Sequence, residues 1–118
     1  MISKKALEFQ RKYLDRSYRA DWNNVTLTGT SKAHQDMIYE ICWWLYENKI
    51  PFITEARFNT GYRPDIIVPD GLPRRIIEVR HSEGSRQSVE KFSRTPEELL
   101  NDIIYVEAGQ KFFPELIL

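Results

Sequence analysis

Two carboxylates and an arginine interrupt the most apolar part of this chain. Asp65 begins one short apolar run, and Glu78 and Arg80 lie in a second run, IIEVR. Both runs have the length and β-branched content of strands, expected at 64–69 and 75–80, and the segment PDGLP between them is typical of a turn. Because successive strand residues point to opposite faces, Glu78 and Arg80 are expected on one face of their strand.

The length of the connection sets which residues face one another. If the connecting loop is 69–74, Val68 pairs with Arg75, and Asp65 lies opposite Glu78 at about 5 Å between Cα atoms. Like charges that close repel and require a cation. Arg80 is one candidate. A divalent cation is the other, since oxygen-only carboxylate sites that hold Mg²⁺ are what phosphate chemistry uses.

A third acid would complete such a metal site. Glu40 is the first candidate, because it lies beside the apolar stripe of a predicted helix, one residue before Ile41, and its side chain could reach an edge of the sheet. Glu55, in the strand expected at 52–59, is the alternative.

The elements that must position these residues follow from hydrophobic periodicity and from breakers. Ser31 is a plausible N-cap for the helix that carries Glu40. His34, in the first turn of that helix, is expected to be a surface or packing residue. The chain predicts an α/β fold, a mixed sheet with helices packed on it. The expected elements are helix 3–18, helix 32–48, strands 52–59, 64–69 and 75–80, helix 85–94, a short helix from Thr95-Pro96, strand 103–107, and an edge strand or docked tail at 108–118.

The order and spacing of these residues resemble the PD-(D/E)xK nuclease superfamily. The likeness rests on Pro64-Asp65, on Glu78-Val79-Arg80, and on the Glu40 helix before them. It covers about 31–107 and is nearest to the archaeal Holliday junction resolvase type. It implies a restriction-endonuclease-like fold with core order αβββαβ, here with an extra N-terminal helix.

The resemblance also implies an activity. The chain would be a Mg²⁺-dependent DNA endonuclease, with Mn²⁺ as a substitute, in which Asp65, Glu78 and Glu40 hold the metal and Arg80 joins them as a catalytic residue. The family motif ends in lysine, whereas arginine stays protonated and cannot act as a base. Arg80 could still stabilise charge on the phosphate. Two basic residues of the next helix, Arg86 and Lys91, could replace part of the lost function.

Composition fits one globular domain. The chain has 118 residues, a net charge of zero and 42% hydrophobic residues, so it can bury a core without disulfides. The lone Cys42 excludes an intrachain disulfide and is expected in that core. Nothing resembles a membrane span or a signal peptide, which predicts a soluble, cytoplasmic protein. We expect one domain over 1–118, made of a basic helix and loop at 1–30, the core at 31–107 and a tail at 108–118.

Basic residues cluster although the net charge is zero, which fits either a local patch for a polyanion or, at the N-terminus, a solvated helix face. The resemblance implies that the partner is DNA. A homodimer through Trp43 or the C-terminal FFPELIL is also expected. Two rival functions stay open: an inactive nucleic-acid-binding module on the same fold, and a protein-interaction domain whose acids are structural. The expected DNA-contacting residues are Lys4, Lys5, Arg63, Arg74, Arg86 and Lys91.

Overall fold

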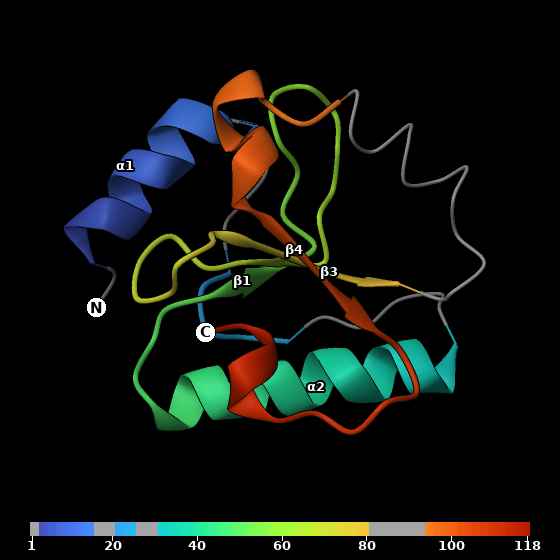
Figure 1. Ribbon diagram of the computed structural model, residues 1–118. Helices are drawn as coiled ribbons and strands as arrows, with labels where there is room; N and C mark the ends of the chain where they lie inside the picture. Colours follow the sequence, from blue (N-terminus) through green and yellow to red (C-terminus); the bar gives the residue numbers. More distant parts are fainter. Residues whose placement is uncertain (1–2, 16–20, 26–30, 81–93) are drawn as a thin grey trace.

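Helix α2, Lys32–Glu47, is the longest of the described elements and lies along one side of the sheet (Figure 1). The Ser31 hydroxyl caps it by accepting the His34 N–H at 3.3 Å, so the predicted helix and its N-cap are confirmed. Asn48 ends the helix, and Lys49 follows with φ of 57°, a left-handed conformation typical of helix C-termini. The buried face of α2 is formed by His34, Met37, Ile38, Ile41, Cys42 and Leu45.

Four strands form one open mixed sheet in this computed structural model, which describes residues 3–15, 21–25, 31–80 and 94–118. The strand order is β1-β2-β3-β4. The first two pairings are antiparallel and the third is parallel. This confirms a mixed α/β fold. The strands are β1 (Ile53–Thr54), β2 (Ile66–Ile67), β3 (Ile76–Arg80) and β4 (Ile103–Glu107).

Strands β3 and β4 match their predicted bounds closely, whereas β1 and β2 are much shorter than predicted. β1 ends at Thr54, because the next residue, Glu55, has a φ of 55° that turns the backbone out of the extended conformation. β2 is confined between Pro64 and Pro69, and proline has no N–H to donate to a neighbouring strand. The predicted helix at 85–94 falls almost wholly on residues 81–93, outside the described residues.

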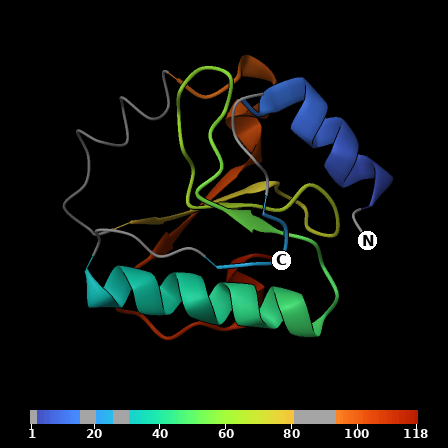
Figure 2. The same cartoon turned by 180° about the vertical axis from the view of Figure 1, so that it is seen from behind.

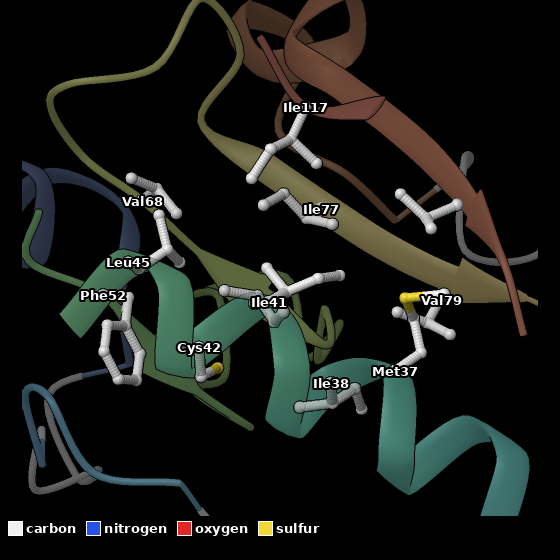
Figure 3. Close-up of a cluster of buried hydrophobic side chains, with 12 residues drawn as sticks. Met37, Ile38, Ile41, Cys42, Leu45, Phe52, Val68, Ile77, Val79 and Ile117 are labelled. Atoms are coloured by element: carbon white, nitrogen blue, oxygen red, sulfur yellow. The ribbon is translucent and has the colours of Figure 1, made fainter. Parts of the chain in front are cut away.

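The sheet has a hydrophobic cluster on each face. Between α2 and the sheet, Ile41, Leu45, Ile77 and Val79 meet the buried Cys42 (Figure 3), which confirms the expected place of that cysteine in the core. This cluster is formed by Met37, Ile38, Ile41, Cys42, Leu45, Phe52, Ile66, Val68, Ile77, Val79, Val106 and Ile117. The opposite face is covered by α1, Lys4–Tyr13, and by the 3₁₀ helix η1, Glu97–Asp102 (Figures 1 and 2). Its cluster includes Phe9, Tyr62, Ile67, Ile76 and Leu99.

Helix α1 ends earlier than the predicted bound of residue 18. Leu14 is already extended and forms a bridge with Phe58, and the Asp15 N–H donates to the Arg57 carbonyl at 2.9 Å. The backbone therefore leaves the helix to hydrogen-bond with the segment after β1.

The C-terminal segment is a docked tail, one of the two forms expected for it. It forms the 3₁₀ helix η2, Pro114–Leu116, and buries Ile117 in the cluster under α2. Within the described parts of the chain, no helix has both the length and the apolar character needed to cross a bilayer.

Candidate active site at the end of the β2–β3 hairpin

The register of β2 and β3 places Asp65 next to Glu78. Ile66 pairs with Ile77 and Ile67 with Ile76, so the next pair outward joins residues 65 and 78. At the other end, the Val68 N–H donates to the Arg75 carbonyl at 2.7 Å. The predicted register is therefore confirmed, and both acids lie at the end of the hairpin away from the turn.

The two carboxylates bind the backbone of each other's strand crosswise. The Asp65 N–H donates to Glu78 Oε1 at 2.7 Å, and the Val79 N–H donates to Asp65 Oδ2 at 2.8 Å. In a regular antiparallel ladder bonded pairs alternate, so the pair after 66–77 would be Pro64 and Val79. Here a carboxylate oxygen accepts the Val79 N–H in place of a strand carbonyl. The acids thus continue the pairing of the strands where β2 ends.

Glu78 and its neighbours are shielded from water. Glu78 is only 3% exposed, and a buried carboxylate requires hydrogen-bond partners. The buried Tyr62 is one of them. Burial, and then the charge of Glu78 and a hydrogen bond to it, raise the pKa of Tyr62. The phenol therefore stays protonated and can donate to the carboxylate.

His34 of α2 reaches Asp65 from the side of the helix. Its Nε2 atom lies 3.3 Å from Asp65 Oδ2, and the two side chains are 10% and 15% exposed. The expectation of a surface or packing residue missed this contact. One signal could have indicated it, because His34 is in helical phase with Met37, Ile38 and Ile41 and so shares the buried face of α2.

Arg80 is directed toward β4 rather than toward the acids. Its Nε lies 2.8 Å from Glu107 Oε1, and its guanidinium carbon is 4.7 Å from the centre of the Tyr105 ring. The cause is the parallel register, which sets Arg80 beside Glu107 and Glu78 beside Tyr105. Arg80, one of the two cations considered for the acid pair, therefore pairs with Glu107. The acids accept the Asp65 and Val79 N–H groups, and His34 lies beside Asp65.

The third acid was assigned to Glu40, and the structure does not bring it to the pair. Glu40 is exposed on α2, and no contact among the described residues joins it to Asp65 or Glu78. Glu55 is nearer, since its N–H donates to the Asp65 carbonyl at 3.4 Å. Among residues 3–15, 21–25, 31–80 and 94–118, no three His, Cys, Asp or Glu side chains are grouped so that they could hold a metal ion.

The predicted DNA-contacting residues lie in different parts of the fold. Arg63 is exposed two residues before Asp65. Lys5 pairs with Asp70 at 3.5 Å, at the turn end of the hairpin, where Arg74 is also exposed. Lys4, in the first turn of α1, is exposed as well. Arg86 and Lys91 lie outside the described residues. Of the four described cations, Arg63 alone is a near neighbour of an acid in the chain, while Lys4 and Lys5 lie on α1 and Arg74 lies in the turn.

A hollow of about 460 Å³ separates α1 from the turn at 69–75. Lys5, Lys12 and Arg75 line it together with Glu8 and Asp70, so its positive charge is partly offset. It is a different place from the acid pair.

Comparisons with known proteins give no family for this chain. No family model matches it, and searches of curated proteins and of solved structures return no significant match.

Proposed function

We propose that this chain is a metal-dependent DNA endonuclease of restriction-endonuclease-like fold. The observation that carries the proposal is the adjacency of Asp65 and Glu78 at one end of the β2–β3 hairpin. The order of the described elements supports it: a helix, three antiparallel-paired strands, and a fourth strand parallel to the third. It agrees with the order expected from the resemblance to the PD-(D/E)xK superfamily except for the helix expected at 85–94, which falls almost wholly outside the described residues.

The donor set of this pair suits Mg²⁺ in kind. Mg²⁺ prefers oxygen ligands and is commonly held by one or two carboxylates together with waters and substrate phosphates. A carboxylate offers about four lone-pair positions, so an oxygen that accepts one backbone N–H can still ligate. Asp65 and Glu78 would hold the ion, and the backbone of Glu55, the alternative third acid, is hydrogen-bonded to that of Asp65. When bound, the metal would polarise the phosphate and supply a hydroxide nucleophile.

The chain's own residues would orient the site and bind the substrate. His34 and the Val79 N–H fix the Asp65 carboxylate through Oδ2, and Tyr62 supports Glu78. Arg80 carries a permanent positive charge at the adjacent edge and would contact a phosphate oxygen. It cannot take a proton from water, so no general base is assigned to position 80. Binding would rest on phosphate contacts and weaken steeply with salt.

A homodimer is part of this proposal, because two copies could cut two strands. Trp43 supports it. The residue is 54% exposed, and its ring stacks between those of Tyr39 and Tyr46, with centroids 6.5 and 6.0 Å away. Exposed apolar patches of this kind mark contact surfaces. In the C-terminal segment Phe113 and Leu118 are also exposed, whereas Phe112, Leu116 and Ile117 pack on the core.

The test is cleavage of labelled linear duplex and four-way-junction DNA in Mg²⁺, in Mn²⁺ and in EDTA. Asp65→Asn is the informative variant, because it removes the charge but keeps an oxygen that can accept the Val79 N–H. We expect it to abolish cleavage while the fold persists. Glu97→Gln, an exposed acid of η1, is the matched control and should cleave like wild type. Cleavage that survives Asp65→Asn unchanged would show that the site is elsewhere.

A second candidate is a nucleic-acid-binding module without catalysis. The pairing of Arg80 with Glu107 favours it, because the position of the family lysine is filled by a residue that cannot titrate and is directed away from the acids. This candidate predicts DNA binding with no cleavage in any metal. It is distinguished from the nuclease by the same cleavage assay.

A further inference from the structure

We infer that Tyr105 and Glu107 of β4 are positioning residues that hold Arg80 as a fixed phosphate contact beside the acid pair. The inference rests on the proposed nucleic-acid function. It names the group of the substrate that this edge of the sheet recognises, a non-bridging phosphate oxygen of the DNA backbone.

The arrangement follows from the parallel pairing of β3 and β4. Glu78 is opposite Tyr105, and Arg80 is opposite Glu107. Alternate residues of a strand share a face, so these four side chains lie on one face of the sheet, the face opposite α2. Tyr105 is 37% exposed. The buried acid therefore borders directly on an open, polar edge.

Arg80 is held in two directions at once. Glu107 binds its Nε at 2.8 Å, and the ring of Tyr105 lies under the guanidinium at 4.7 Å from centroid to Cζ. The guanidinium carries five N–H donors in a rigid fork. Among the described residues, the structure gives a hydrogen-bond partner to the Nε donor of Arg80 and none to its four Nη donors. The side chain is 46% exposed, so a ligand can approach them.

A stabilising ion pair alone is a poor account of this arrangement. Exposed pairs of this kind add little to stability, and Glu107 offsets the charge that Arg80 would contribute to a general positive field. What Glu107 and Tyr105 do provide is order. A pre-oriented guanidinium loses less rotamer freedom when it binds a phosphate.

The decisive experiment measures the DNA affinity of one variant, Glu107→Gln, for which simple electrostatics and a positioning role predict changes of opposite sign. Glu107→Gln removes a negative charge, so simple electrostatics predicts tighter DNA binding, whereas loss of a positioning residue predicts weaker binding. We would measure anisotropy of a labelled duplex in EDTA across a salt series. We expect Glu107→Gln to weaken binding by about threefold to tenfold. The matched control Glu115→Gln, an exposed acid of η2, should leave binding unchanged or tighten it slightly.

Two further variants define the contact itself. Arg80→Ala should lower the slope of log affinity against log salt by about one, the loss of a single phosphate contact. Tyr105→Leu keeps an apolar side chain but removes the ring, and should weaken binding as Glu107→Gln does. The ¹⁵Nε–¹H resonance of Arg80 should be sharp in the wild type and broadened in Glu107→Gln. This readout reports positioning without any DNA.

The outcomes separate this inference from the proposed function. Tighter binding by Glu107→Gln, equal to that of Glu115→Gln, would overturn the positioning role, and so would an Arg80 resonance unchanged by the substitution. Duplex binding with the expected variant pattern but no cleavage in any metal would overturn the nuclease and leave the inference standing. A wild-type protein that does not bind DNA would overturn both.

Discussion

Glu78 gives the sharpest test of what holds the acid pair together, because two substitutions should have different effects on stability. Glu78→Ala removes the acceptor of the Asp65 N–H and the partner of Tyr62 inside a site where Glu78 is 3% exposed. A hydrogen bond to a charged group contributes about 1.5 to 3 kcal/mol, and stranded buried donors add to the loss. We expect Glu78→Ala to lower the free energy of unfolding by about 3 kcal/mol.

Glu78→Gln should behave differently. The amide keeps a carbonyl oxygen for the Asp65 N–H, and Tyr62 can accept as well as donate a hydrogen bond. The substitution also removes a like charge beside Asp65. The removal of charge repulsion and the weakening of the hydrogen bond nearly cancel, so the free energy of unfolding should stay within about 1 kcal/mol of wild type. If the chain is a nuclease, the same variant should lose cleavage.

Urea unfolding followed by tryptophan fluorescence measures both effects, with Glu115→Ala as an exposed-acid control. In a thermal scan Glu78→Ala should melt roughly 10 °C below wild type, since about 1 kcal/mol corresponds to about 4 °C in a domain of this size. Equal destabilisation by Ala and Gln would refute the idea that a neutral acceptor suffices. A change below about 1 kcal/mol for Glu78→Ala would refute the structural role of these hydrogen bonds.

Three other expectations follow from the structure. His34→Leu leaves the part-buried Asp65 carboxylate without its histidine and should cost about 2 kcal/mol in urea unfolding, with Asp65→Asn in the same chain recovering part of the loss. Burial raises the pKa of the Cys42 thiol to about 12, so the native protein should resist alkylation at pH 8, and rapid alkylation of the native protein would contradict this expectation. The free energy of unfolding should also decline as pH rises from 9.0 toward 12, because in this range the thiol ionises in the unfolded state before it does in the folded state. Gly71→Ala should lower the melting temperature by several degrees, because φ is 101° and a Cβ would lie 3.1 Å from the Ile50 side chain, whereas an unchanged melting temperature would show that the turn adapts freely.

Local pattern was enough to predict the parts of this molecule that depend on neighbours in sequence. Helix 32–48, its Ser31 cap and strand 103–107 follow from periodicity and capping. The pairing of Asp65 with Glu78 follows from the length of one turn. Each of these features is formed within a segment of about 16 residues or fewer, so the local sequence pattern is sufficient to predict it.

The parts that could not be predicted depend on tertiary contacts. His34 meets Asp65 only because α2 packs across the sheet. Arg80 meets Glu107, 27 residues later, only because β4 is parallel to β3. β1 is short because Glu55 adopts a left-handed backbone, and nothing local to a glutamate indicates that conformation. The Glu40 assignment relied on helical phase alone, which gives an angle around the axis but not what lies beyond it.

The sequence separation of these contacts has a consequence for how the protein folds. Asp65 and Glu78 are 13 residues apart, so their strands can pair once one short loop closes. Arg80 and Glu107 are 27 residues apart, so their contact requires the closure of a longer loop. Short-range contacts form first because their closure entropy is smaller. We expect the contacts between Asp65 and Glu78 to form early in folding and the contact between Arg80 and Glu107 to form late. A species in which the two negative charges are already close, while the Arg80 guanidinium is not yet ordered, would then precede the native state. Pulsed hydrogen exchange would reveal this order as protection of the Val79 amide before that of Ala108, and simultaneous protection of the two would show that the sheet forms as one unit.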